Sequence, residues 1–309
     1  MAILFFSEVD DPDEWRDAFA TQCPDMSFRV WPDIGDPSDI EVALVWHPPD
    51  NALDQFPNLR LIASLGAGVD HLFRGAGLPA GIPVSRIVDR SLTEQMVEYV
   101  VLGALFCHRQ MPAYMAQQKQ ANWQLLRQPL GRERRIGLLG LGELGMASAR
   151  ALKALQFDVA GWSRSPKNDA DIPDYVGTEG LKDFLARTDI LVCLLPLTPQ
   201  TEGLLNAAQF ARLPRGASFV NAGRGGHVVE GDLLAALDSG QLGHAMLDVF
   251  RAEPLPAQSP FWSHPGVTLT PHVASITNAS SGTALVLENM QRVRAGDAPL
   301  YEVVPSEGY

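Results

Sequence analysis

Residues 136–155 have the sequence IGLLGLGELGMASARALKAL: a short apolar run, a glycine-rich turn, and a segment rich in alanine and leucine. The turn has the spacing GxGxxG. Between a strand and a helix, its first glycine permits a tight turn, the second lets the backbone approach a pyrophosphate, and the third allows close helix–strand packing. The N-terminus of the helix offers N–H groups to phosphates. The stretch predicts a dinucleotide site made by Gly140, Gly142, Glu143, Leu144 and Gly145; a glycine turn without a ligand is the competing interpretation.

The end of the next apolar run bears on the choice of dinucleotide. NAD sites usually place a carboxylate about 20 residues beyond the glycine turn, where it binds the ribose 2′-hydroxyl. Here the run ends in Trp162-Ser163-Arg164-Ser165, and Lys167 is close. A hydroxyl and a guanidinium bind a 2′-phosphate through charge-assisted hydrogen bonds, whereas a carboxylate would repel it. We therefore expect Ser163, Arg164, Ser165 and Lys167 to favour NADPH over NADH; the alternative is a solvated basic loop that binds no ligand.

Strand and helix patterns alternate along the rest of the chain. Several short runs are apolar at nearly every position, as expected of strands covered on both faces. Over 309 residues this alternation predicts an α/β fold with parallel sheets, and the length suggests two domains. The expected strands are 2–6, 42–46, 59–64, 135–139, 158–162, 190–195, 217–221, 244–248 and 267–270.

Two long helices can be placed from their boundary signals. Ser91-Leu92-Thr93-Glu94 matches a capping box, and an apolar helical pattern follows as far as Phe106; this helix could join two domains. A second helix is expected from about Thr277 to Arg294, with a tail from Gly296 to Tyr309. A loop containing proline and arginine interrupts the pattern between 122 and 133.

Composition excludes several classes of protein. The formal net charge of −12 argues against nucleic-acid and anionic-membrane partners, which need a basic face, but not against a small anionic ligand. No apolar run approaches the about 18 residues of a membrane-spanning helix, and the N-terminus does not have the pattern of a signal peptide. Three cysteines without CxxC spacing predict neither a disulfide framework nor a metal site, and they favour a cytoplasmic location.

Three polar residues in the second half of the chain each follow a separate predicted strand: Arg224, Glu253 and His272. In open parallel sheets, ligands bind at the carboxyl ends of the strands. The three side chains are therefore expected at one crevice, beside the nicotinamide. Taken singly, each could be an ordinary loop residue, but their joint occurrence downstream of a dinucleotide turn favours a catalytic role.

These residue types suit the reduction of a 2-keto acid. A planar guanidinium can hold the substrate carboxylate in bidentate fashion, which predicts that Arg224 binds substrate. A proton must reach the carbonyl oxygen as hydride reaches the carbon, and an imidazole such as that of His272 can give one near neutral pH. The carboxylate of Glu253 would stabilise the imidazolium. The other six histidines, including His227, are mostly interpreted as structural.

As an ordered set, five motifs resemble the D-isomer-specific 2-hydroxyacid dehydrogenase family over nearly the whole chain. They are Gly66-Ala67-Gly68-Val69-Asp70-His71, the glycine turn, Asn221-Ala222-Gly223-Arg224-Gly225, Leu247-Asp248-Val249-Phe250-Arg251-Ala252-Glu253-Pro254, and Thr270-Pro271-His272. Within the family the chain is similar to the glyoxylate/hydroxypyruvate reductase A group. That closer likeness lies in residues 44–49, 64–68 and 162–165.

The resemblance implies two α/β domains with a cleft between them. A flavodoxin-like substrate domain would comprise residues 1–98 and 274–309, and a Rossmann-type cofactor domain would comprise 99–273. It also implies a homodimer, in which the segment around Trp123 lies where relatives use a loop across the dimer. The activity implied is NADPH-dependent reduction of glyoxylate and hydroxypyruvate.

The resemblance assigns roles to further residues. Arg224, Glu253 and His272 would be the catalytic trio, with Arg224 and His272 also contacting substrate. Ala67 and Gly68 would offer backbone amides to the substrate carboxylate, and Trp46 would restrict the pocket to small substrates, although a core aromatic is as good an interpretation of Trp46. The implied cofactor contacts are Leu195, Pro196, Thr201, Ala222, Gly223 and Asp248.

Other functions are compatible with the same motifs. The chain could reduce another 2-keto acid, such as phenylpyruvate or 2-ketogluconate. It could also be a non-catalytic, corepressor-like protein that senses NAD(P), since such a protein could keep the whole trio.

Overall fold

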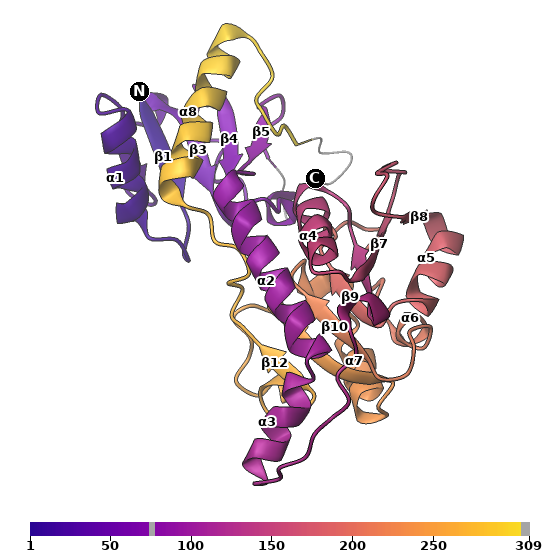
Figure 1. The fold of residues 1–309 in the computed structure, drawn as a ribbon. Helices are drawn as coiled ribbons and strands as arrows, with labels where there is room; N and C mark the ends of the chain where they lie inside the picture. Colours follow the sequence, from indigo (N-terminus) through magenta and orange to yellow (C-terminus); the bar gives the residue numbers. More distant parts are fainter. Residues whose placement is uncertain (74–77, 304–309) are drawn as a thin grey trace. The chain divides into compact units, whose positions relative to one another are not determined.

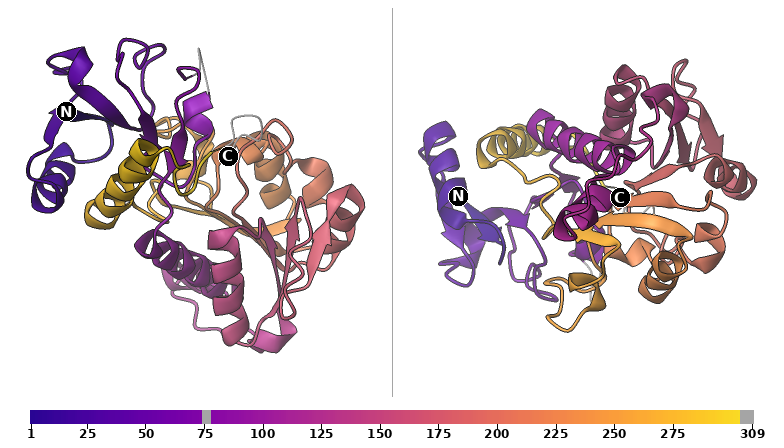
Figure 2. Two further views of the ribbon diagram at one scale, coloured as in Figure 1. Left: turned by 90° about the horizontal axis from the view of Figure 1, so that it is seen from above. Right: turned by 60° about the horizontal axis from the view of Figure 1, so that its bottom comes forward.

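The computed structural model describes residues 1–73 and 78–303. It contains two compact units (Figures 1 and 2). One combines Met1–Leu92 with the segment from Ile276 onward, and the other is Thr93–Ser275. The division into 1–98 plus 274–309 and 99–273 stays a prediction.

The first unit is built on a five-stranded parallel sheet in the order β2-β1-β3-β4-β5. This is the flavodoxin-like order. The strands are β1 (Ala2–Phe6), β2 (Ser27–Val30), β3 (Ile40–Val45), β4 (Leu61–Ser64) and β5 (Val84–Arg86). Helices α1 (Pro12–Gln22) and α8 (Ala279–Ala295) pack against one another, so segments far apart in the sequence lie side by side in this unit.

The faces of this sheet are covered differently. On one face, Trp15 and Phe19 of α1 and Val286 and Met290 of α8 pack with alternate residues of the central strands. On the other face the cover comes from connecting segments that supply Leu53, Phe56, Leu59, Val69 and Leu72. Both faces are apolar, which explains why the strands lack polar alternation.

The second unit holds a seven-stranded parallel sheet in the order β12-β11-β10-β9-β6-β7-β8. The strands are β6 (Arg135–Leu139), β7 (Asp158–Ser163), β8 (Asp174–Val176), β9 (Ile190–Cys193), β10 (Ala217–Asn221), β11 (Leu242–Leu247) and β12 (Val267–Leu269). Chain order reverses direction between β6 and β9, which is the switch point of a Rossmann-type sheet and the usual place for a dinucleotide.

Helices cover both faces of this second sheet. Helices α2 (Arg90–His108) and α4 (Glu143–Ala154) pack on one face. Helices α5 (Gly177–Ala186), α6 (Ala207–Phe210) and α7 (Glu230–Asp238) pack on the other. Helix α3 (Met111–Lys119) follows α2 and presents no buried residue.

The structure confirms the α/β class and the two parallel sheets, and it corrects local details. The predicted capping box at Ser91 is wrong: α2 begins at Arg90, and the Asp89 carboxylate accepts the N–H of Leu92 at 2.7 Å. The short strands β2, β5 and β8 were not predicted. The expected tail is also wrong in part, because Tyr301 and Val303 exchange backbone hydrogen bonds with β5, while 304–309 lie outside the described residues.

The expectation about membranes concerns helices only. Within residues 1–73 and 78–303, no helix combines the length and apolar character that crossing a bilayer requires.

Candidate active site

The glycine turn joins β6 to α4 and leaves the helix N-terminus open. Gly140 has φ +99°, a left-handed conformation that favours glycine. A Cβ on Gly145 would lie 2.0 Å from the Gly140 carbonyl oxygen, so the helix can approach the turn only because residue 145 has no side chain. Gly142, at the N-cap, cannot cap the helix with a side chain. The first N–H groups of α4 are therefore available to an anion, and the turn fits a pyrophosphate.

The loop after β7 carries the groups predicted to select the cofactor. Ser163 is buried, and its hydroxyl donates to the Ser165 carbonyl at 2.8 Å, which shapes the turn. The backbone N–H of Lys167 donates to the Asp174 carboxylate at 2.7 Å. The side chains of Arg164 and Lys167 are exposed. This arrangement leaves two cationic side chains at the carboxyl end of β7.

The loops after β9 and β10 supply the next predicted cofactor contacts. Leu195 is buried, and the Thr201 hydroxyl donates to the Pro196 carbonyl at 2.8 Å, closing the loop on itself. Ala222 is buried and its N–H donates to the Cys193 carbonyl. Gly223 follows in the same loop, so these residues lie at the carboxyl ends of two neighbouring strands.

Arg224 is held by its backbone on both sides. Its N–H donates to Nδ1 of His227 at 3.2 Å, and its carbonyl accepts from the Asn221 amide, also at 3.2 Å. Its guanidinium donates to the Gly223 carbonyl at 2.9 Å. The next residue, Gly225, lets the loop lie directly on the peptide after Phe250, because a Cβ there would lie 1.9 Å from the Phe250 carbonyl carbon.

His272 and Glu253 form a hydrogen-bonded pair. Nδ1 of His272 donates to Oε2 of Glu253 at 2.7 Å, while Oε1 of Glu253 accepts the N–H of Phe250 at 2.7 Å. About a third of each side chain is exposed. Because an ionised carboxylate only accepts, the proton lies on Nδ1 of the neutral ring, and Nε2 is left to exchange a proton with another molecule.

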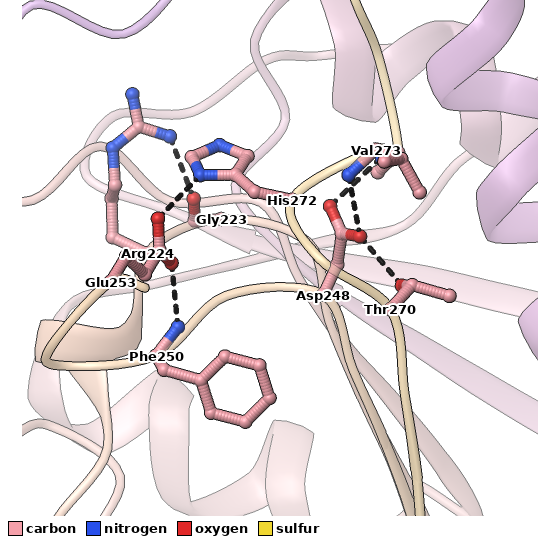
Figure 3. Close-up of polar contacts among 9 residues, drawn as sticks. Gly223, Arg224, Asp248, Phe250, Glu253, Thr270, His272 and Val273 are labelled. Carbon is pink, nitrogen blue, oxygen red and sulfur yellow. Dashed lines mark hydrogen bonds and ion pairs between the residues drawn. The ribbon is translucent and has the colours of Figure 1, made fainter. Parts of the chain in front are cut away.

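The electrostatics favour an ionised Glu253. Burial opposes its charge, but the hydrogen bond and positive charge of His272, the Phe250 N–H and the Arg224 guanidinium outweigh burial and lower the pKa of Glu253. Figure 3 shows the guanidinium, the carboxylate and the imidazole lying together at the strand ends. The structure thus brings together the three residues that the sequence singled out.

Asp248 has a role that the sequence did not indicate. Its side chain is buried, and its carboxylate accepts from the Thr270 hydroxyl at 2.6 Å and from the N–H groups of Val273 at 2.8 Å and Ala274 at 2.9 Å (Figure 3). These bonds fix the segment that carries His272. They occupy three of about four acceptor positions on the carboxylate. The predicted contact of Asp248 with the cofactor stays a prediction.

His227, which the sequence analysis treated as structural, links two loops of the site. It is fully buried; Nδ1 accepts the N–H of Arg224, so Nε2 carries the proton and donates to the Pro196 carbonyl at 3.2 Å. The imidazole therefore joins the Arg224 loop to the loop after β9. Its place three residues after Arg224 in Gly-Gly-His is the one signal in the sequence, and it does not distinguish this role from an ordinary loop histidine.

The residues predicted to contact substrate in the first unit follow β3 and β4. Trp46 stacks on His71 with ring centroids 4.0 Å apart, and a Cβ on Gly66 would lie 3.1 Å from the Trp46 ring. The carbonyls of Ala67 and Gly68 accept from Arg86 and from the Ser64 hydroxyl, which fixes that turn. Trp46 also packs on the core of this unit. The structure is therefore compatible with a core aromatic and with a side chain that restricts the substrate pocket.

Comparison with known proteins agrees with this geometry. Residues 101–274 match the NAD-binding domain of the D-isomer-specific 2-hydroxyacid dehydrogenases. The chain is 40% identical to the glyoxylate/hydroxypyruvate reductase A of Yersinia enterocolitica over 314 aligned positions, with both chains fully covered. A protein of the same name from Serratia proteamaculans is 39% identical, again over both full lengths.

Solved structures give the same result. A D-isomer-specific 2-hydroxyacid dehydrogenase from Xanthobacter autotrophicus, in complex with NADPH and MES, is 42% identical with a TM-score of 0.95 and covers 100% of this chain and 99% of its own. An NADPH-dependent glyoxylate/hydroxypyruvate reductase from Sinorhizobium meliloti, in complex with NADP and sulfate, is 40% identical with a TM-score of 0.94 and the same coverage. The chain therefore belongs to the D-isomer-specific 2-hydroxyacid dehydrogenase family, a family of NAD(P)-dependent oxidoreductases.

Proposed function

We propose that this protein reduces small 2-keto acids, with glyoxylate and hydroxypyruvate as substrates, to 2-hydroxy acids at the expense of NADPH. The observation that carries the proposal is the hydrogen-bonded pair of His272 and Glu253, beside Arg224, at the carboxyl edge of a Rossmann-type sheet. The names of the relatives from Yersinia and Sinorhizobium support the choice of substrates.

The chain's own residues account for the chemistry as follows. NADPH, when bound, supplies the hydride that reduces the carbonyl carbon. Arg224 holds the substrate carboxylate through its planar guanidinium. His272 gives the proton from Nε2 to the carbonyl oxygen, and Glu253 keeps the ring oriented and favours its charged form. In the oxidative direction, His272 takes the proton back.

The reaction is tested by following NADPH oxidation with glyoxylate, hydroxypyruvate, pyruvate and phenylpyruvate. The first two should give the highest kcat/KM. A preference for phenylpyruvate would replace the substrate assignment. Absence of turnover with all four, while the protein still binds NADPH, would contradict the enzymatic proposal and favour a sensing protein.

The cofactor preference is assigned to Arg164, with Lys167 close by. Both side chains are exposed at the carboxyl end of β7, the place where a 2′-phosphate would lie. Arg164→Ala should raise the KM for NADPH about 10-fold or more, since a charge-assisted bond contributes about 1.5–3 kcal/mol, and should leave the KM for NADH nearly unchanged. Arg215→Ala is the matched control, because Arg215 precedes β10 and therefore lies at the amino ends of the strands, away from the predicted cofactor site. Equal effects on both cofactors would contradict the assignment.

A homodimer is the proposed assembly. Trp123 is 97% exposed and Leu125 is 88% exposed, and Met111, Met115 and Leu130 add further exposed apolar surface to the same segment. Such a concentration of apolar side chains is typical of a protein–protein interface. Sedimentation should show a dimer that dissociates in the double variant Trp123→Ser with Leu125→Ser. Trp262→Ser, at another exposed tryptophan, should leave the dimer intact, and a monomeric wild type would refute the proposed assembly.

The free cysteines support a cytoplasmic location.

A further inference from the structure

The segment that carries His272 is held in an unusual conformation. His272 has φ +56°, in the left-handed region that residues other than glycine adopt rarely and at a cost in free energy. Its N–H donates to the Asp248 carbonyl at 2.9 Å, and the two following N–H groups donate to the Asp248 carboxylate. The orientation of His272 therefore depends on where Asp248 holds these groups.

The Asp248 carboxylate is held in turn by a hydroxyl. Thr270 follows β12 and its hydroxyl lies 2.6 Å from Oδ1 of Asp248. The carboxylate acts as an acceptor, since it also receives two backbone N–H groups. The single proton of the Thr270 hydroxyl therefore points at Asp248, and its oxygen is free to accept.

A second hydroxyl, from a distant part of the sequence, adds another hydrogen bond to this series. The phenol of Tyr99, on α2, lies 2.7 Å from Oγ1 of Thr270. Because Thr270 donates to Asp248, the Tyr99 hydroxyl must donate to Thr270. Tyr99 is buried, and burial raises the pKa of its phenol, so the donor keeps its proton at neutral pH. Tyr99 thus donates to Thr270, and Thr270 donates to the Asp248 carboxylate.

We infer that Tyr99 and Thr270 are positioning residues for the proton donor His272, acting through the Asp248 carboxylate. Their hydrogen bonds lead to Asp248, and through Asp248 they fix the backbone that carries the imidazole. The inference rests on the proposed function, in which His272 gives the proton to the carbonyl oxygen. It adds a helix residue more than 170 positions away in the sequence to the machinery of that step.

The decisive variant is Tyr99→Phe, which removes one oxygen atom and keeps the ring in the core. Loss of a hydrogen bond that contributes about 0.5–1.5 kcal/mol should lower kcat about 3- to 10-fold, with the KM for NADPH within about twofold of wild type. Thr270→Val, which removes the link itself, should lower kcat more than Tyr99→Phe does. Thr270→Ser keeps a hydroxyl and should stay within about twofold of wild type.

The split between kcat and KM distinguishes positioning from a general loss of stability. A looser segment weakens the contact of His272 with Glu253, so kcat should fall in Tyr99→Phe and Thr270→Val while the KM for NADPH stays near that of wild type. Tyr175→Phe is the matched control, because Tyr175 packs on Phe184 elsewhere in the same unit and should leave kcat unchanged. An unchanged kcat in Tyr99→Phe would overturn the inference, as would a kcat in Thr270→Ser that falls as far as in Thr270→Val.

A readout without substrate separates this inference from the proposed function. In protein labelled with ¹⁵N-histidine, the Nδ1–H signal of His272, identified by its loss in His272→Asn, should exchange with water faster in Tyr99→Phe than in wild type. If wild type reduces no 2-keto acid but this difference is found, the proposed function fails and the positioning role stands. If wild type is active and the exchange rates are equal, the positioning role is wrong.

Discussion

The two parallel sheets carry loops of different chemical character at their carboxyl ends. After β10, β11 and β12, the seven-stranded sheet presents the charged or titratable side chains of Arg224, Glu253 and His272. After β3 and β4, the five-stranded sheet presents an aromatic ring, Trp46, and a turn of small residues from Gly66 to Gly68. Both sheets rest on buried apolar strands, so sheet topology creates the two edges without deciding what each can do. The residues immediately after the strands decide that.

The comparison predicts that the charged edge controls turnover. His272→Asn should lower kcat about 10²- to 10⁴-fold, the usual contribution of a positioned proton donor, while NADPH binding stays intact. His264→Asn is the matched control, because His264 also pairs with a carboxylate, that of Asp238 at 3.3 Å, but precedes β12 at the opposite edge. Stopped-flow reduction of glyoxylate measures both variants. Similar losses of kcat in the two variants would show that turnover does not depend on which end of the strands carries the histidine.

A smaller effect is expected when the partner of the proton donor is neutralised. Burial opposes the charge of Glu253, but His272, the Phe250 N–H and Arg224 together lower its pKa, so the carboxylate is charged when it accepts the Nδ1–H of His272. Glu253→Gln removes that charge and weakens the hydrogen bond, so kcat at neutral pH should fall about 10-fold. Steady-state kinetics with glyoxylate measure the loss. Asp238→Asn should leave kcat unchanged; an unchanged kcat in Glu253→Gln would separate Glu253 from the proton transfer.

The loops after β3 and β4 should affect selectivity more than turnover. Trp46→Ala removes a ring that stacks on His71, and we expect kcat/KM for phenylpyruvate to rise about 10-fold relative to glyoxylate. The kcat for glyoxylate should change only a few-fold. Steady-state kinetics with both substrates measure the ratio. A parallel fall for both substrates, together with a lower Tm, would assign Trp46 to the core.

The smallest effect on turnover is expected from a buried histidine at the amino edge of the seven-stranded sheet. Burial, with the charge of His264, lowers the pKa of His244 to about 4. Between pH 6.5 and about 4 the unfolded chain binds a proton that the folded chain does not, so stability falls as the pH falls through that window, by roughly 3 kcal/mol in all. His244→Gln should remove this dependence and leave kcat at pH 7.5 unchanged. Urea unfolding at pH 7.5 and 5 measures the free energy of unfolding. If His244→Gln loses as much stability between these pH values as wild type does, His244 is not the cause of the dependence.

The sequence predicts the central strands and the strand ends well because both rest on strong local signals. Runs such as Ile136–Leu139 in β6 and Ile190–Cys193 in β9 contain no charged or hydroxyl side chain, and polar residues stand out beyond the ends of such runs. The strands β2, β5 and β8 have only three or four residues, and each includes a charged residue (Arg29, Arg86 and Asp174), so they lack that signal. The start of α2 is ambiguous for another reason: Asp89 and Ser91 are both good capping residues, and pattern alone cannot choose between them.

Within the site, the sequence indicates which residues carry charge but not how they are held. Arg224, Glu253 and His272 follow recognisable motifs, whereas the hydrogen bonds of Asp248, Thr270 and Tyr99 join segments far apart in the chain. His227 is similar, because its role depends on the backbone of Arg224 and on the Pro196 carbonyl. Such contacts exist only once the strands are in register, and no local pattern encodes them.

The contact of Gly225 with the Phe250 peptide has a consequence for how this protein can vary. A Cβ on residue 225 would lie 1.9 Å from the Phe250 carbonyl carbon, so any side chain there would force apart the loops that carry the Arg224 guanidinium and the Glu253 carboxylate. In a saturation library, this position should therefore tolerate no replacement. Because Gly225 has no Cβ, the two loops can lie close enough to bring the charges of Arg224 and Glu253 together. We therefore expect glycine to be required at position 225 as strictly as arginine is at position 224.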